Sequence, residues 1–129
     1  MKLVLRSGID IIEIARLETI QPNIRARFLQ RVYTCRELEE ANGSVSSLAG
    51  RFAAKEAVAK ALGCGIGPVK WQEIEIIRQA SGEPQLVLHE AAARLAGDAG
   101  LVNWSISISH DATHAVAVAV AAGLVEEDL

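Results

Sequence analysis

The stretch that decides the fold is GRFAAKEAVAKALG, residues 50–63. Alanine and straight-chain residues dominate it, and these favour a helix. We expect the longest helix of the chain here, with Ser44 or Ser46 as its N-cap, an end near Leu62 and Gly63 as its C-cap. The alanines would let another layer of the structure come close to the helix backbone.

The charged residues of this helix can be interpreted in two ways. Phe52, Glu56 and Lys60 follow one another at i, i+4 spacing and so form one row. The simpler interpretation is an exposed Glu56–Lys60 pair, worth roughly a few tenths of a kcal/mol, with Arg51 and Lys55 as a solvated flank. The alternative is that the row faces a cleft, which the surrounding alanines favour.

Shorter elements surround this helix. We expect strands at 3–11, 73–78, 85–88, 104–109 and 114–120, and helices at 13–21, 24–30 and 89–99. Thr34 and Glu37 fit a capping box, so a further short helix begins at Thr34. Helices combined with mostly local strand pairs indicate an α+β fold. The expected architecture is a single domain, 1–129, with a mixed or antiparallel sheet wrapped around the long helix.

The last two strands have an alternating pattern of large and small residues. Serines alternate with isoleucines in the first of them, 104–109, and alanines alternate with valines in the second, 114–120. This pattern predicts one bulky apolar face and one face of small side chains. The small face would accept either the long helix or a second subunit.

Composition excludes several classes of protein. The formal net charge of −3 argues against a nucleic-acid-binding protein. No apolar run reaches the roughly 20 residues of a membrane span, and the N-terminal apolar run is too short for a secretory signal. Cys35 and Cys64 have no metal-binding spacing, so free thiols are expected. A cytoplasmic location is the expectation.

The positive charge is concentrated in one stretch. Between residues 16 and 36 lie five arginines, 16, 25, 27, 31 and 36, and a single acid, Glu18. Such a stretch on an acidic protein suggests an acidic partner, although a solvated helical face is the commoner explanation.

Three further positions can carry chemistry. Asp10 lies between isoleucines, and it is either an N-cap with Glu13 at N3, which the residues alone favour, or an oxygen ligand for a hard cation. His110 follows Ser109 at a strand end. A histidine there is a base, a hydrogen-bond donor to a phosphate or, most commonly, a turn residue. The loop 63–68 contains three glycines that would allow a phosphate close to the backbone, but it lacks the P-loop spacing.

Three motifs together resemble one family. They are Gly8-Ile9-Asp10, the stretch 51–63, and Ile106-Ser107-Ile108-Ser109-His110-Asp111. In order, spacing and total length they are similar to the holo-acyl-carrier-protein synthases, the short branch of the 4′-phosphopantetheinyl transferases. The chain departs from this family at His114, where an aromatic is frequent, and at 18–23, which does not align cleanly.

The resemblance implies a set of site residues. Asp10 and Glu56 match the family's metal-binding carboxylates, with Mg²⁺ as the cofactor, and together with Lys60 they are the implied catalytic residues. Lys60 matches a lysine beside the coenzyme A phosphates. The implied coenzyme A contacts are Arg51, Lys60, Gly63, Gly65, Pro84, Ser109 and His110.

The resemblance also implies a reaction and partners. A serine hydroxyl of an acyl carrier protein attacks the β-phosphorus of coenzyme A, and 3′,5′-ADP leaves. The carrier would dock on the region from Arg16 to Arg31, and the chain would form homotrimers with active sites between subunits. The alternatives are a non-catalytic coenzyme A- or nucleotide-binding oligomer and a purely structural oligomer. The general base, which is Glu56 or a water beside it, stays open, as do the carriers accepted, the use of acylated coenzyme A, and the roles of His89, His114, Cys35 and Cys64.

Overall fold

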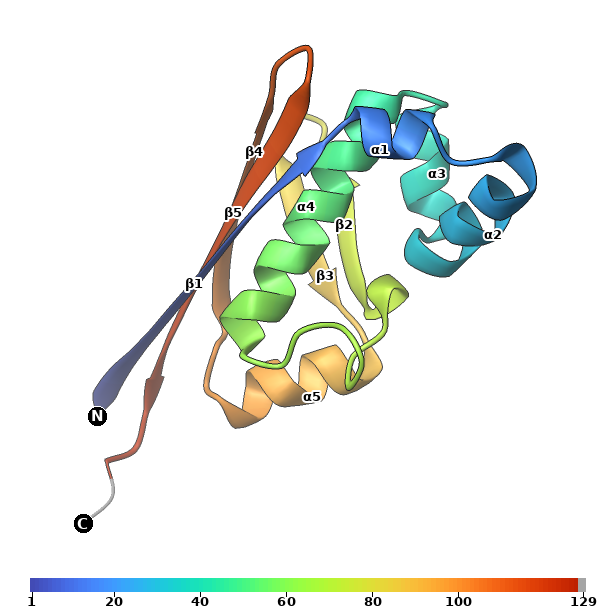
Figure 1. Ribbon diagram of the computed structural model, residues 1–129. Coiled ribbons are helices and arrows are strands. Elements are labelled where there is room, and N and C mark those ends of the chain that lie inside the picture. Colours follow the sequence, from blue (N-terminus) through green and yellow to red (C-terminus); the bar gives the residue numbers. More distant parts are fainter. Residues whose placement is uncertain (128–129) are drawn as a thin grey trace.

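The computed structural model describes residues 1–127 and has an α+β fold built around one long helix (Figure 1). Three strands form an antiparallel sheet in the order β1-β5-β4: β1 (Lys2–Glu13), β5 (His114–Val125) and β4 (Asn103–His110). A separate antiparallel pair consists of β2 (Ile74–Arg78) and β3 (Pro84–Leu88). Helix α4 (Val45–Leu62) contacts both sheets. The expected α+β fold around a long helix is therefore confirmed.

The caps of α4 are those that the sequence suggested. The Ser44 hydroxyl accepts a hydrogen bond from the Ser47 N–H at 3.2 Å, so Ser44 rather than Ser46 is the N-cap. At the other end Gly63 has φ +79°, a left-handed conformation that glycine adopts without steric cost. The helix therefore covers the predicted range, with both ends fixed by local chemistry.

The long sheet packs against α4 through small residues. The buried side chains of β5 on this face are all alanine: Ala115, Ala117, Ala119 and Ala121. On β1, a Cβ at Gly8 would overlap the carbonyl oxygen of Ala57, so the strand and helix backbones are in direct contact there. This close approach sets the position of the neighbouring residue on the same face, Asp10.

The prediction that the last hairpin has one face of bulky and one face of small side chains is wrong. In the observed register Ile106 lies opposite Ala119, and Ser105 lies opposite Val120. Each face therefore carries one row of large and one row of small side chains. The isoleucine and alanine rows face α4, whereas the serine and valine rows face outward. Register depends on how the hairpin closes, which the alternation within each strand does not determine.

Five shorter helical elements complete the described part of the chain, residues 1–127. They are α1 (Ala15–Glu18), α2 (Pro22–Val32), α3 (Cys35–Ala41), the 3₁₀ turn η1 (Trp71–Glu73) and α5 (Glu90–Asp98). The helix predicted at 13–21 is reduced to α1, because Glu13 still pairs with His114 in the sheet. The capping box at Thr34 and Glu37 is confirmed. The N-cap interpretation of Asp10 is wrong, since Asp10 lies inside β1 and α1 begins after Ile14.

A buried ion pair joins α3 and α4 to the β2 region. The Lys55 ammonium donates to the Glu37 carboxylate at 2.7 Å and to the backbone carbonyls of Ile74 and Trp71 at 2.6 and 3.0 Å. Both charged side chains are fully buried. Lys55 and Arg51 are thus not a solvated flank, which corrects that interpretation.

The outward face of the long sheet is strongly apolar. Leu3, Leu5, Ile9 and Ile11 of β1 are each at least 60% exposed there, and Val120 and Leu124 of β5 are also exposed. We call these six residues the outer apolar face. Within residues 1–127 no helix is both long and apolar enough to cross a membrane.

Candidate functional site

Asp10 and Glu56 meet at one cavity of about 530 Å³ between β1, α4 and the first two helices. We call it the carboxylate cavity. Its apolar wall comes from α1, α2, α4 and neighbouring residues, and includes Leu17, Phe28 and Phe52. Asp10 reaches the cavity because β1 crosses α4 at Gly8. The family resemblance implied that this pair shares a site, and in the structure both residues line the same cavity.

Asp10 and Lys60 both influence the ionisation of Glu56. Partial burial raises the pKa of Glu56, the negative charge of Asp10 raises it further, and the Lys60 ammonium opposes both effects. A second carboxylate nearby makes it costly to ionise both groups without a cation. The neighbouring carboxylates are therefore a point at which a metal ion or a proton can compensate negative charge, although Arg16 and Lys60 bring positive charge close to them.

Lys60 lies one helical turn beyond Glu56, as its i, i+4 spacing predicts. Its ammonium donates to the Asp10 carboxylate at 3.2 Å and to the carbonyl oxygen of Ile9 at 2.8 Å. About half of the Lys60 side chain is exposed (52%), so its ammonium is also accessible to an anion from outside. Asp10, Glu56 and Lys60 thus form one charged group at the crossing of β1 and α4.

The carboxylate cavity fits Mg²⁺ chemically. Mg²⁺ prefers oxygen ligands, keeps several waters, and binds through one or two carboxylates together with substrate phosphates. Among residues 1–127 there is no cluster of three or more His, Cys, Asp or Glu side chains that would hold a metal. Mg²⁺ bound by two carboxylates would fill its other coordination positions with water and substrate oxygens. A closed structural metal site, by contrast, takes all of its ligands from the protein.

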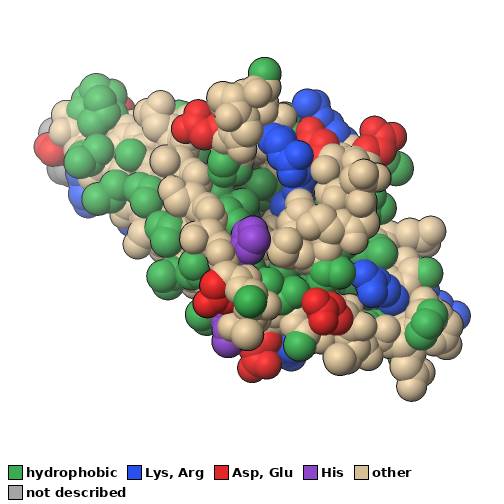
Figure 2. Space-filling model, turned by 90° about the horizontal axis from the view of Figure 1, so that it is seen from above, with side chains coloured by type: hydrophobic (Ala, Val, Ile, Leu, Met, Phe, Trp, Pro, Cys, Tyr) green, Lys and Arg blue, Asp and Glu red, His purple; other side chains and the backbone are tan. Residues whose placement is uncertain are grey.

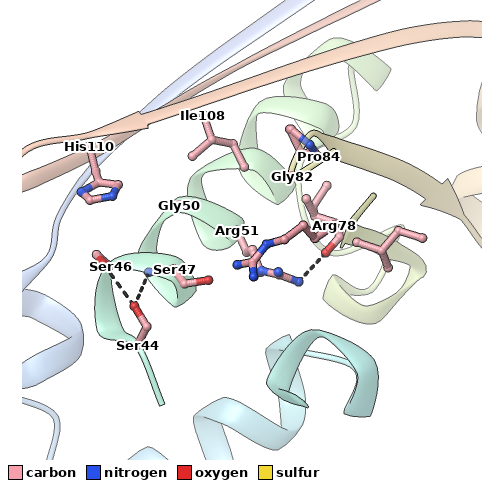
Figure 3. Close-up of a pocket in the computed structure, with 12 residues that line it drawn as sticks. Ser44, Ser46, Ser47, Gly50, Arg51, Arg78, Gly82, Pro84, Ile108 and His110 are labelled. Atoms are coloured by element: carbon pink, nitrogen blue, oxygen red, sulfur yellow. Dashed lines mark hydrogen bonds between the residues drawn. The ribbon is translucent and has the colours of Figure 1, made fainter. Parts of the chain in front are cut away.

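A second pocket, of about 400 Å³, lies at the N-terminal end of α4 and contains three of the predicted coenzyme A contacts: Arg51, Pro84 and His110. In Figure 3 the His110 ring extends toward it from the end of β4, and Pro84 borders it from the β2–β3 side. Gly50 allows β4 to approach, because a Cβ there would lie 2.7 Å from Ile108 Cγ2. We call this the arginine pocket.

The arginine pocket is suited to anions. Two guanidinium groups, Arg51 and Arg78, line it together with His110 and the hydroxyls of Ser44, Ser46 and Ser47. The free N–H groups and the positive dipole end of α4 point to the same region. Figure 2 shows a histidine beside a hollow on this side of the molecule, with Lys and Arg side chains nearby. Arg78, Ser46 and Ser47 were missed as site residues, because only the fold brings the end of β2 beside the start of α4.

Of the other predicted contacts, Lys60 lines neither pocket but bonds to Asp10, and three more also lie outside both. Ser109 is exposed on the outward face of β4, opposite Val116, because neighbouring strand residues point to opposite faces. Gly63 and Gly65 lie just beyond α4, both with positive φ, and neither lines the carboxylate cavity or the arginine pocket. Within one chain, the structure does not bring these residues to Arg51 or Glu56.

The two pockets lie on different sides of α4. Arg51 and Glu56 are five positions apart, which separates their directions by roughly 140° around a helix of 3.6 residues per turn. Accordingly, the lining of the arginine pocket and that of the carboxylate cavity have no residue in common. A ligand touching both sets of residues would therefore need to bridge two faces of the helix or two subunits.

Comparison with known proteins identifies the fold and the family. The sequence model of the 4′-phosphopantetheinyl transferase superfamily matches residues 6–121. The chain belongs to this superfamily. Its enzyme class is thus that of the phosphopantetheinyl transferases.

Individual members of the superfamily agree over nearly the whole chain. The holo-acyl-carrier-protein synthase of Moorella thermoacetica is 46% identical over 119 residues, which cover 90% of this chain and 92% of that protein. The crystal structure of the Helicobacter pylori synthase in complex with coenzyme A has a TM-score of 0.81 at 36% identity and covers 89% of this chain and 98% of the other. A Bacillus anthracis synthase solved with coenzyme A (3′,5′-ADP) has a TM-score of 0.76 at 33% identity and covers 95% and 100%.

Proposed function

We propose that this phosphopantetheinyl transferase moves the 4′-phosphopantetheine group of coenzyme A to a serine of an apo-acyl carrier protein and releases 3′,5′-ADP. The observation that carries the proposal is the meeting of Asp10 and Glu56 at one cavity, with Lys60 on the Asp10 carboxylate. Relatives named for this reaction, two of them solved with coenzyme A or its nucleotide, support the same substrates. We assign the activity to the whole chain, 1–129, as one domain.

The carboxylate cavity would hold Mg²⁺ through Asp10 and Glu56. When bound, the ion would neutralise charge on the pyrophosphate of coenzyme A. Phosphoryl transfer of this kind is governed by positioning and charge stabilisation rather than by covalent help from the protein. The chain's own contribution is to hold both carboxylates at the crossing of β1 and α4, where the Gly8–Ala57 contact fixes their relative position.

Lys60 would contact the phosphate oxygens from its position beside Asp10 at the edge of the carboxylate cavity. Its side chain is half exposed, and the protein partners of its ammonium are Asp10 and the carbonyl of Ile9. A cation at this position offsets the charge that develops on the leaving phosphate.

The arginine pocket would bind the nucleotide end of coenzyme A through Arg51 and His110. Because this pocket and the carboxylate cavity share no residue, we propose that one active site combines the arginine pocket of one subunit with the carboxylate cavity of another in a homotrimer. The outer apolar face supports subunit association, since an apolar patch of this kind marks an interaction surface.

Subunit complementation tests this arrangement. His110→Ala and Asp10→Asn each remove one half of the proposed site, so each variant alone should be nearly inactive. Mixing the two under conditions that exchange subunits should restore part of the activity, because some sites then combine an intact His110 with an intact Asp10. If the trimers have exchanged subunits and the mixture is still as inactive as each variant alone, both halves of the site belong to one chain.

The carrier would dock beside the carboxylate cavity through α1 and α2. Arg16 and Phe28 line the cavity itself. Among the described residues, Arg16, Arg25, Arg27 and Arg31 form no ion pair, so their charges are available to a partner. An acidic carrier would be steered toward this region by complementary charge.

The direct test is incubation with apo-acyl carrier protein, coenzyme A and Mg²⁺, followed by mass spectrometry. We expect the carrier to gain the mass of one phosphopantetheine, and we expect EDTA to prevent the gain. Glu56→Gln should abolish it, whereas Glu39→Gln, an exposed acid on α3, should leave it unchanged. Binding of coenzyme A without any mass gain would favour the non-catalytic alternative.

A further inference from the structure

Glu40 on α3 organises one wall of the arginine pocket. Its Oε1 accepts hydrogen bonds from Arg51 Nη1 at 3.0 Å and from the backbone N–H of Arg78 at 2.8 Å. Its Oε2 accepts from Arg36 Nε at 3.4 Å. One carboxylate therefore fixes a side chain of α4 and the backbone at the end of β2, the two elements from which both guanidinium groups of the pocket come.

The Glu40 carboxylate stays ionised under ordinary conditions. Burial alone would raise its pKa, but the hydrogen bonds from the Arg78 N–H and from Arg51, together with the charge of Arg51, hold it below its usual range. A charged acceptor makes these hydrogen bonds stronger than neutral ones. Glu40 therefore holds Arg51 as a charged acceptor down to a lower pH than an ordinary glutamate would.

Arg51 is anchored through one nitrogen and leaves the others free. Both of its hydrogen bonds to protein come from Nη1, the second being to the carbonyl oxygen of Ile76 at 2.7 Å. Only 5% of Arg51 is exposed, and its Nε and Nη2 have no hydrogen-bond partner in the described part of the protein. Within residues 1–127 every fully buried side-chain nitrogen or oxygen has such a partner, so these two nitrogens are not fully buried. Its Nε and Nη2 are therefore accessible, and the arginine pocket that Arg51 lines is the opening through which they can be reached (Figure 3).

We propose that Glu40 is a positioning residue that fixes Arg51 for the 3′-phosphate of coenzyme A and so determines the preference for coenzyme A over dephospho-coenzyme A. This proposal rests on the proposed function and extends it to a residue that touches no substrate. A guanidinium presents a rigid, planar set of donors that matches phosphate. Holding that plane in place before binding removes an ordering cost from the binding step.

The test compares Glu40→Ala with wild type, using coenzyme A and dephospho-coenzyme A as alternative donors. We expect the KM for coenzyme A to rise about tenfold, the order expected for a lost charge-assisted hydrogen bond. The KM for dephospho-coenzyme A and the KM for the carrier should change less than about twofold, which is small on the same scale. Arg36→Gln is the matched control, because it removes the outer partner of the same carboxylate and leaves Arg51 in place.

A second variant keeps the test decisive if Glu40→Ala does not fold. Glu40→Gln retains an oxygen that can accept from Arg51 and Arg78 but removes the charge, so it should show an intermediate loss for coenzyme A alone. Equal KM increases for both donors in a folded variant, or no increase in either, would overturn the proposal. A wild-type enzyme that transfers from neither donor would instead refute the proposed function, so the two failures are distinguishable.

Discussion

Gly8 on β1 lies directly against the backbone carbonyl of Ala57 on α4, with no room for a side chain between them. Asp10 and Ile12 follow Gly8 at alternate positions on the same face of β1. This contact therefore sets the distance between the strand that carries Asp10 and the helix that carries Glu56. Fold and candidate site depend on the same pair of residues.

Gly8→Ala tests this dependence. The added Cβ overlaps the Ala57 carbonyl, so β1 must move away from α4. We expect the free energy of unfolding to fall by about 1–3 kcal/mol, as for overpacking in other cores, and transfer activity to fall as Asp10 leaves Glu56. Gly97→Ala in α5 is the control, because nothing lies within 4 Å of its Cβ position and alanine favours a helix. Equal stability of Gly8→Ala and wild type in denaturant titrations would contradict the account.

Sequence patterns could predict those features that are governed by neighbouring residues. The start of α4 at Ser44, its end at Gly63 and the capping box of Thr34 and Glu37 depend on contacts within a few positions, and all are confirmed. The positions of the strands were also predicted, although β1 and β5 extend further than expected. Asp10 and Glu56 were paired only through the family resemblance, because no local pattern joins residues so far apart in the chain.

What the sequence could not predict depends on contacts between distant segments. Lys55 reads as a surface residue of an alanine-rich helix, but Glu37 and the carbonyl groups of Trp71 and Ile74 give it a complete set of buried partners. The faces of the last hairpin depend on register, and Arg78 enters the arginine pocket only because β2 ends beside α3 and α4. Asp10 reads as an N-cap because the sheet pairing that keeps it in a strand comes from β5.

Lys55→Met should strongly destabilise the fold. Removing one partner of a buried ion pair leaves the Glu37 carboxylate buried without its countercharge, which typically costs about 3–5 kcal/mol. The double variant Lys55→Met/Glu37→Gln removes that uncompensated charge and should be more stable than Lys55→Met alone. Urea unfolding of the three proteins measures both differences. A double variant less stable than Lys55→Met would show that the charge of Glu37 is not the source of the cost.

The raised pKa of Glu56 predicts how stability depends on pH in metal-free protein. Because the pKa is higher in the folded state than in the unfolded state, the folded protein binds the proton more tightly, and the stability gained from protonation is lost as pH rises through the folded-state pKa. At neutral pH wild type should therefore be less stable than Glu56→Gln, and the difference should shrink on acidification toward the ordinary Glu range. Thermal unfolding of both proteins at a series of pH values tests this. A difference that grows at low pH would have the wrong sign.

Docking of the carrier should be sensitive to salt. The arginines of α1 and α2 have no carboxylate partners among the described residues, so their attraction to an acidic carrier is screened as ionic strength rises. We expect the KM for carrier to increase several-fold from low to high salt, with less change in the KM for coenzyme A. Arg27→Ser should reduce this salt dependence, whereas Arg94→Ser on α5 should not. If the KM for carrier does not change between low and high salt, this region has no electrostatic role in docking.

The most direct measurement of the central claim is a double-variant cycle on Mg²⁺-dependent transfer with Asp10→Asn, Glu56→Gln and the combination of the two. If both carboxylates hold one ion, either substitution removes most of the catalysis that the site provides, so the combined variant should lose little more than the worse single variant. Losses in kcat/KM that simply add in the double variant would mean that Asp10 and Glu56 act independently, and the shared magnesium site would be contradicted.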